Sequence, residues 1–125
     1  MSQTRVLIVE DDNISRYMLT EMCDKLGFDH ETAETGAHCI ELLQHDPGRF
    51  GAILLDLHMP RVSGLDVLAH IRNRVGEPLR DVPVIAITAD ETWHDRAACQ
   101  AAGFDDVLPK PISLANLQRV LGQIA

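Results

Sequence analysis

Polar residues that could act chemically follow four of the five segments predicted as β-strands, at the point where each segment ends. Glu10 and Asp11 come directly after the first strand segment, and Asp56 comes directly after the third. Thr88 follows the fourth segment, and Lys110 lies just beyond the fifth. Three carboxylates, a hydroxyl and an ammonium group form a reactive or metal-binding set if the fold brings them together.

Gathered carboxylates repel one another, so such a cluster either keeps one acid protonated or binds a cation. Oxygen ligands without nearby His or Cys side chains favour a hard ion, so Mg²⁺ is expected and Mn²⁺ is an alternative. Acidic residues after a strand can also simply cap the next helix, and Asp12 or Asn13 is suited to that role. The coincidence of polar residues at four strand ends favours the cation site.

The strand segments themselves differ in character. Three are apolar and rich in β-favouring residues, which suits strands buried on both faces of a parallel sheet. A more polar segment suits an edge strand, and a short one precedes Lys110. The apolar segments are residues 5–9, 52–55 and 84–87, the edge segment is 28–33, and the short one is 105–108.

Helical patterns separate these strands. The first helix is predicted from helical spacing, with Asn13 available as its N-cap and Gly27 as its C-terminal stop. Thr35 is expected to cap the second helix, and Ser63-Gly64-Leu65-Asp66 predicts a capping box at the third. Thr92-Trp93-His94-Asp95 resembles another capping box, and Ser113 is expected to cap the last helix. The apolar residues at helical spacing are Ile14, Met18, Met22 and Leu26 in the first helix, Ile40 and Leu43 in the second, Leu65, Leu68, Ile71 and Val75 in the third, and Leu114, Leu117, Leu121 and Ile124 in the last, where they face inward.

The alternation of strands and helices predicts a doubly wound (βα)₅ domain of the flavodoxin-like α/β class, a three-layer sandwich with a parallel sheet. The expected strand order is 2-1-3-4-5, and residues 1–125 form one domain. In such a sheet the carboxyl ends of the strands converge near the switch point of the strand order. Glu10, Asp11 and Asp56 are therefore expected to be neighbours.

Composition limits the class of partner. Nineteen acidic residues against eleven basic ones give a formal net charge of -8, which disfavours direct binding to nucleic acid or to an anionic membrane surface. No apolar run approaches the roughly 20 residues that a membrane span needs, and no signal peptide is expected before the first strand. The three cysteines, without a CxxC pair, are expected to be reduced thiols. A cytoplasmic protein is therefore predicted.

Four motifs, "VLIVEDD", "ILLDLHMP", "VIAITAD" and "VLPKPI", occur in this order and spacing. Together they resemble the receiver domains of response regulators and hybrid histidine kinases, and the resemblance covers essentially the whole chain. It implies that Asp56 accepts a phosphoryl group and that Thr88 and Lys110 contact that group. It also implies that Glu10, Asp11, Asp56 and the backbone carbonyl of His58 hold Mg²⁺.

The resemblance carries further implications for regulation. The side chains of His58 and Asp90 occupy positions that tune the lifetime of the phosphoryl group, and the bond between Lys110 and Pro111 is commonly cis in the family. Many receivers have Tyr or Phe three positions before the active-site lysine, where this chain has Val107. Valine cannot make the same rotamer switch, so the usual coupling to the output surface is in doubt.

The resemblance implies a histidine kinase or a histidine phosphotransfer protein as the phosphoryl donor. The output partner is unknown and could be a fused domain, because the chain could be a free-standing regulator or a receiver from a hybrid kinase. The last helices and strand are expected to shift on phosphorylation. The domain is then a signalling switch that catalyses only its own phosphorylation and dephosphorylation.

Three other functions share parts of this pattern. A haloacid-dehalogenase-like phosphatase needs a second acid two residues after the strand-end aspartate, where this chain has His58, and usually a longer chain. A flavodoxin-like cofactor module needs a Ser/Thr/Gly-rich phosphate loop after the first strand, where Glu10-Asp11-Asp12 would repel a flavin phosphate. A pseudo-receiver that acts by protein contacts alone gains some support from Val107, whereas the intact Asp56, Thr88 and Lys110 argue against it.

Overall fold

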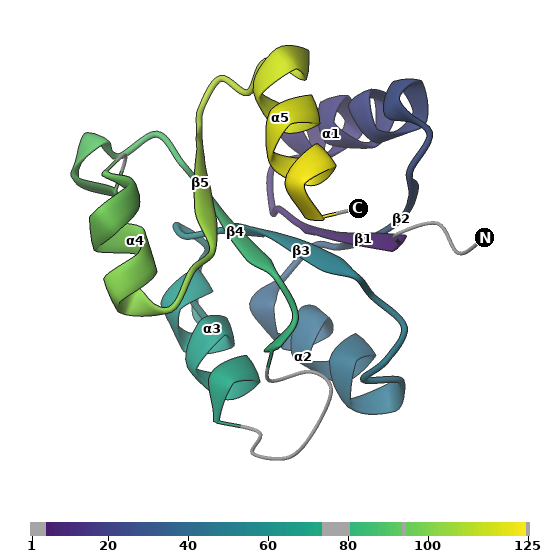
Figure 1. Ribbon diagram of the computed structural model, residues 1–125. Coiled ribbons are helices and arrows are strands. Elements are labelled where there is room, and N and C mark those ends of the chain that lie inside the picture. Colours follow the sequence, from purple (N-terminus) through teal and green to yellow (C-terminus); the bar gives the residue numbers. More distant parts are fainter. Residues whose placement is uncertain (1–4, 74–80, 94, 125) are drawn as a thin grey trace.

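The computed structural model describes residues 5–73, 81–93 and 95–124 of the chain. Strands and helices alternate, and the strands form one central sheet (Figure 1). Within those ranges, no helix is both long enough and apolar enough to cross a bilayer. In chain order the elements are β1 (Arg5–Val9), α1 (Asn13–Leu26), β2 (Asp29–Ala33), α2 (Gly36–His45), β3 (Ala52–Asp56), α3 (Gly64–Arg72), β4 (Val84–Thr88), the short 3₁₀ turn η2 (Glu91–Trp93), α4 (Arg96–Ala102), β5 (Asp106–Pro109) and α5 (Leu114–Ile124).

The strands pair in parallel and lie in the order β2-β1-β3-β4-β5, which confirms the predicted doubly wound topology. Each predicted strand limit lies within one residue of the observed one. Every residue of β3 and β4 is buried, as expected for strands covered on both faces. Because β1 lies between β2 and β3, the switch point of the strand order falls beside β1.

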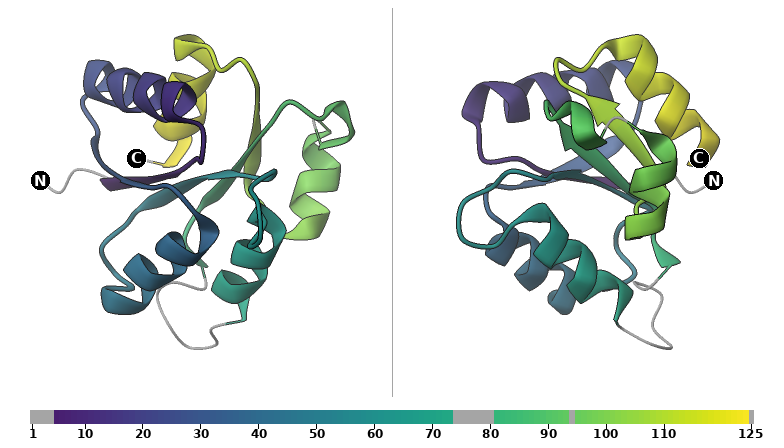
Figure 2. Two further views of the ribbon diagram at one scale, coloured as in Figure 1. Left: turned by 180° about the vertical axis from the view of Figure 1, so that it is seen from behind. Right: turned by 90° about the vertical axis from the view of Figure 1, so that its left-hand side faces the viewer.

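Two apolar cores lie on opposite faces of the sheet. Alternate residues of β1 supply both, with Leu7 and Val9 in one core and Val6 and Ile8 in the other. Helices α2, α3 and α4 contribute to the first core, and α1 and α5 contribute to the second. Figure 2 shows the resulting three layers, which were predicted from the sequence.

Three predicted helix starts are confirmed by hydrogen bonds at their caps. The side chain of Thr35 accepts a hydrogen bond at the start of α2. Ser63 and Asp66 form the predicted reciprocal capping box at α3. The Ser113 hydroxyl accepts a hydrogen bond from the backbone of α5. Local sequence was sufficient here, because each cap is formed by residues three apart.

The sequence offered both Asp12 and Asn13 as caps of the first helix, and the structure shows Asp12 in that role. The carboxylate of Asp12 accepts the backbone N–H of Ser15 at 2.8 Å, and Asn13 is the first helical residue. Asp and Asn are equally good caps, so propensity does not choose between neighbours. The predicted stop at Gly27 is confirmed, with a left-handed φ of 81°.

The predicted capping box before the fourth helix is wrong in its first residue. Thr92 lies in η2, and the carboxylate of Asp95 caps α4 by accepting the N–H of Ala97 at 2.9 Å. His94 lies outside the described residues. An additional turn that the pattern did not reveal therefore precedes α4.

Two apolar residues of the predicted first helix lie on its solvent side. Ile14 is 72% exposed and Met18 is 50% exposed, whereas Leu19 and Cys23 are the residues buried against the sheet. A shift of one residue turns the buried stripe of a helix by about 100°. The helical period was therefore predicted correctly, but the period alone did not show which face of the helix is buried.

Two other helices also begin with an exposed leucine. Leu65 in α3 and Leu114 in α5 are 43% and 37% exposed, and the prediction that Leu114 faces inward was wrong. The buried positions of these helices include Val67 and Leu117. Val75, predicted for the third helix, lies outside the described residues.

The contact between α3 and β3 predicts a specific sensitivity at Gly64. A Cβ at this position would lie 2.5 Å from the backbone oxygen of Asp56 and 2.7 Å from Cα of Leu57. We expect Gly64→Ala to lower the free energy of unfolding by about 1 to 3 kcal/mol, because the backbone must shift. Gly122→Ala is the control, since its Cβ meets nothing within 4 Å in α5. Urea denaturation checks this, and equal midpoints for the two variants would contradict it.

Thiol accessibility gives a second prediction. Cys23, Cys39 and Cys99 are all fully buried, and burial raises the pKa of Cys23 and Cys39 to about 12. Only a thiolate reacts readily, so iodoacetamide at neutral pH should leave the native protein unmodified. In guanidinium chloride all three thiols should react, as intact mass would report. Rapid labelling of the native protein would show that these helices open readily.

Candidate functional site

The strand ends bring together the acidic residues that the sequence singled out. Glu10, Asp11 and Asp56 each offer a carboxylate oxygen, and these atoms lie within 4.8 Å of one another. Glu10 is fully buried and Asp56 is 3% exposed, whereas Asp11 is exposed. The three residues come from β3 and from the segment that follows β1, which are neighbours only because β1 pairs with β3. The cluster therefore depends on the strand order.

Lys110 reaches this cluster from the far end of the chain. Its Nζ donates to Oε1 of Glu10 at 2.6 Å and to Oδ2 of Asp56 at 3.5 Å. The peptide bond to Pro111 is cis, as the resemblance implied. The backbone N–H of Lys110 also donates to the carbonyl of Thr88 at 2.9 Å, which ties the end of β5 to the end of β4. One ammonium group thus faces two buried carboxylates.

Burial and charge shift two pKa values in this cluster. Burial is the largest cause that raises the pKa of Glu10, and its contact with Asp56 raises it further, against the opposing effect of Lys110. Desolvation tends to lower the pKa of Lys110, but its contacts with Glu10 and Asp56 outweigh this and raise the pKa. Lys110 is therefore charged at neutral pH, while Glu10 resists ionisation. One ammonium does not fully compensate the carboxylates.

The residues present fit a divalent cation. Oε2 of Glu10 is buried and has no hydrogen-bond partner among the described residues. A buried carboxylate oxygen without a partner is costly unless something positive binds it. The three carboxylates form an all-oxygen set of ligands, which suits Mg²⁺ and also Mn²⁺.

The backbone after β3 also contacts the cluster. The N–H of His58 donates to Oδ1 of Asp56 at 3.1 Å, so His58 lies directly beside that carboxylate. Lys110 contacts the other oxygen, Oδ2. The two contacts therefore hold the Asp56 carboxylate by both of its oxygens. The carbonyl of His58 stays a predicted ligand.

Thr88 ends β4 and is fully buried. Its hydroxyl accepts the N–H of Asp90 at 2.9 Å. The carboxylate of Asp90 lies 3.9 Å from Nε2 of His58. The two residues predicted to modulate the site therefore come together, one from each of the loops that follow β3 and β4.

Arg16 was not singled out from the sequence. Its guanidinium donates to the backbone carbonyl of Glu10 at 2.9 Å, and its side chain is only 14% exposed. A second contact, at 3.4 Å, reaches Glu34 after β2. Arg16 thereby ties the loop after β1 to α1. An arginine in the first turns of a helix normally indicates a solvated surface charge, so no sequence signal identified it.

Val107 lies under α4. It is 6% exposed and belongs to the same core as Phe104, against which the ring of Trp93 packs. The Trp93 and Phe104 rings meet edge to face, with centroids 6.5 Å apart. The aromatic contact beside α4 is therefore formed by residues other than position 107.

Residues 6–121 match the response regulator receiver domain family. Response regulator MprA of Mycolicibacterium vanbaalenii is 36% identical over 113 residues, which cover 90% of this chain and 46% of that protein. The chain thus spans about half the length of the curated relatives it matches.

Two solved structures are similar in fold. The receiver domain of the sensor histidine kinase PA1611 from Pseudomonas aeruginosa, with a magnesium ion coordinated in its active site cleft, has a TM-score of 0.84 and 31% identity, covering 98% of each chain. A co-crystal structure of the Saccharomyces cerevisiae histidine phosphotransfer signalling protein Ypd1 with the receiver domain of its downstream response regulator Ssk1 has a TM-score of 0.82 and 25% identity, covering 98% of this chain and 88% of that one. By sequence, topology and the acidic cluster at its strand ends, this chain belongs to the response regulator receiver domain family.

Proposed function

We propose that this domain, residues 1–125, accepts a phosphoryl group on Asp56 from a phosphohistidine and acts as a signalling switch. The observation that carries the proposal is the buried carboxylate of Asp56, which lies 3.5 Å from the ammonium of Lys110 and within the cluster of Glu10 and Asp11. A strand-end nucleophile beside a fixed cation suits phosphoryl transfer, in which positioning and charge stabilisation supply the catalysis.

In the proposed reaction, a carboxylate oxygen of Asp56 attacks the phosphorus atom and forms an acyl phosphate. The bond from phosphorus to the donor imidazole nitrogen breaks, and the imidazole leaves with the electron pair. Lys110 offsets negative charge on the phosphoryl oxygens, and the Thr88 hydroxyl donates a hydrogen bond to one of them. A Mg²⁺ ion held by Glu10, Asp11, Asp56 and the His58 carbonyl would supply the further positive charge that this step requires.

The donor in this proposal is a histidine kinase or a histidine phosphotransfer protein. Family membership supports it, as does the similarity to the receiver of the Ypd1 and Ssk1 pair. The exposed apolar side chains of Ile14, Tyr17 and Met18 on α1 give such a donor a surface on which to dock. They belong to the first turns of α1, directly after the acidic residues.

The side chains of His58 and Asp90 are proposed to tune the lifetime of the acyl phosphate, because they meet at 3.9 Å beside the phosphoacceptor. The output partner, or a fused output domain, would respond to the surface of α4, β5 and α5. Because valine at position 107 cannot make the aromatic rotamer switch, we propose that coupling to this surface uses other side chains. We place the protein in the cytoplasm, as a switch without further substrates and without direct contact to nucleic acid or membrane.

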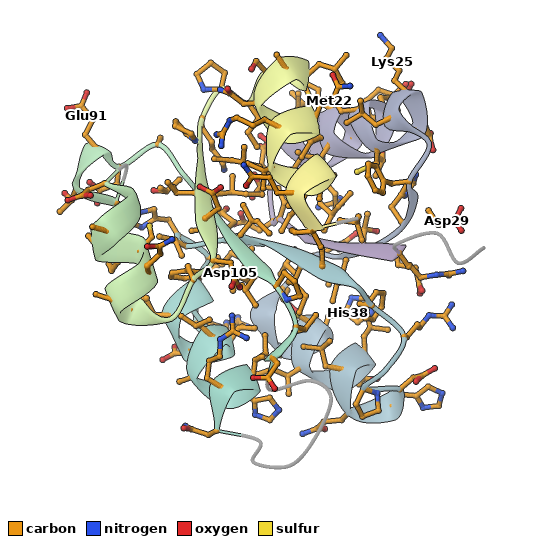
Figure 3. The ribbon with its side chains drawn as sticks, in the orientation of Figure 1. Met22, Lys25, Asp29, His38, Glu91 and Asp105 are labelled. Carbon is orange, nitrogen blue, oxygen red and sulfur yellow. The ribbon has the colours of Figure 1, made fainter. Side chains whose placement is uncertain are left out.

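The first test is phosphorylation by a small-molecule donor. The protein incubated with acetyl phosphate and Mg²⁺, then quenched rapidly in the cold, should gain the mass of one phosphoryl group. Asp56→Asn should abolish the gain, and omission of the metal should reduce it strongly. Asp29→Asn is the matched control, because Asp29 is exposed at the start of β2 (Figure 3). A chain that never labels, beside a control receiver that does, would favour the pseudo-receiver alternative.

The second test is stabilisation by the metal. Mg²⁺ should raise the free energy of unfolding because it binds the native cluster, by about 2.7 kcal/mol at a hundred times its Kd. Asp11→Asn should remove most of this gain, because it takes one carboxylate from the cluster. Asp11 is exposed, so the substitution should change the stability of the metal-free protein little. Urea midpoints at constant ionic strength measure the effect, with Asp29→Asn again as control. An unchanged urea midpoint of the wild-type protein in Mg²⁺ would contradict the proposed metal site.

A further inference from the structure

A groove of about 340 Å³ opens beside the acidic cluster, between α1 and the segment that joins β5 to α5. Its volume lies within the range of small-molecule sites. Figure 3 shows Met22, one of its lining residues, where α1 runs beside α5. The groove is lined by Glu10, Ser15, Met18, Leu19, Met22, Ala89, Lys110, Pro111 and Ile112.

The groove is continuous with the phosphoacceptor site. Glu10 and Lys110 line it, and the same Lys110 ammonium lies 3.5 Å from Oδ2 of Asp56. Ala89, which directly follows the buried Thr88, contributes only a methyl group to the wall. A donor whose phosphorus lies at Asp56 therefore has the rest of its structure within reach of this groove.

The chemistry of the lining selects the kind of group that fits. Away from Glu10 and Lys110, most side chains that form the wall are apolar, among them Met18, Met22 and Ile112. Methionine side chains adapt to ligands of different shape. Among the described residues, Lys110 is the one cation that lines the groove, and Glu10 and Asp56 already engage it. A second anionic group would find no partner among these lining residues. The fitting group is a short, uncharged, apolar chain.

We propose that this groove is the leaving-group site for acyl phosphates that carry an apolar acyl chain, such as butyryl phosphate. The proposal rests on the proposed function, since it needs Asp56 as nucleophile. A carboxylate oxygen of Asp56 attacks phosphorus, the bond between phosphorus and the acyl oxygen breaks, and the carboxylate leaves with the electron pair. No proton, oxidant or further reactant is needed for the balance of atoms and charge.

The test compares the initial rates of phosphorylation of Asp56 by butyryl phosphate and by acetyl phosphate, followed by intact mass. Acetate and butyrate are leaving groups of nearly the same basicity, so the intrinsic reactivity of the two donors is matched. Each buried methylene contributes about 0.8 kcal/mol, so two methylenes should raise the rate per donor concentration by up to about fifteenfold. Even partial burial should give about a threefold preference.

Two variants separate the groove from the rest of the surface. Met18→Gln places a polar side chain in the groove wall at a half-exposed position, and it should bring the ratio of the butyryl phosphate rate to the acetyl phosphate rate down to about one. Ile14→Gln is the matched control, because Ile14 is 72% exposed on the same helix and does not line the groove. It should keep the full preference.

A binding measurement gives a readout that does not depend on phosphoryl transfer. Butylphosphonate has an apolar chain on a bond that cannot be transferred, and methylphosphonate lacks the chain. In protein with ¹³C-labelled methionine methyls, butylphosphonate should shift the Met18 and Met22 signals saturably, and methylphosphonate should not. Equal shifts with both compounds, or none with either, would overturn the proposal.

The outcomes distinguish the leaving-group groove from the phosphoacceptor function of Asp56. Labelling by acetyl phosphate without preference for butyryl phosphate overturns the groove proposal and leaves the phosphoacceptor function standing. A preference that survives Met18→Gln also overturns it, because the chain then binds elsewhere. Failure of both donors to label Asp56, while a control receiver labels, overturns the proposed function and this inference with it.

Discussion

The concentration of negative charge at one end of a buried sheet is the constraint on which this structure depends. Glu10 and Asp56 are almost completely removed from water, and Asp11 adds a third carboxylate at the surface. The Lys110 ammonium, 2.6 Å from Glu10, is the one cation that the described residues place among them. It offsets the repulsion only in part, because one oxygen of Glu10 has no partner. This imbalance is what makes the site ready to bind a cation and, in the proposed function, to accept a phosphoryl group beside it.

Much of the remaining architecture holds these charges in place. Parallel pairing of β1 with β3 brings two acidic segments together that are separated by a helix, a strand and another helix. Gly64 allows the start of α3 to lie directly against the backbone of Asp56, and Arg16 anchors the carbonyl of Glu10. Hydrogen bonds from β5 to β4 position Lys110 at the opposite side. Each of these contacts fixes a backbone segment beside the cluster, which reduces the reorganisation that the proposed phosphoryl transfer would otherwise require.

Helix α1 has apolar side chains on two neighbouring faces, one buried against the sheet and one exposed. In α1 the stripe through Leu19 and Cys23 is buried, and the neighbouring stripe through Ile14 and Met18 stays in contact with solvent. A helix that only covered the sheet would not need the second stripe, since each exposed apolar side chain contributes nothing to the core. Its position beside the acidic cluster explains both the docking surface proposed for the donor and the groove proposed for a leaving group.

The sequence by itself determined the alternation of strands and helices, the strand order, the helix caps formed by residues three apart, and the set of polar residues at strand ends. These features depend on local periodicity and on the general rules of parallel sheets, so they can be derived without coordinates. Only the tertiary structure decided which face of α1 is buried, because period alone does not give the direction in which a helix meets the sheet. It also decided that Arg16 supports the loop of Glu10. The groove formed by Met18, Ile112 and Lys110 is a second feature of this kind. Both join residues whose relative positions depend on the packing of the whole fold.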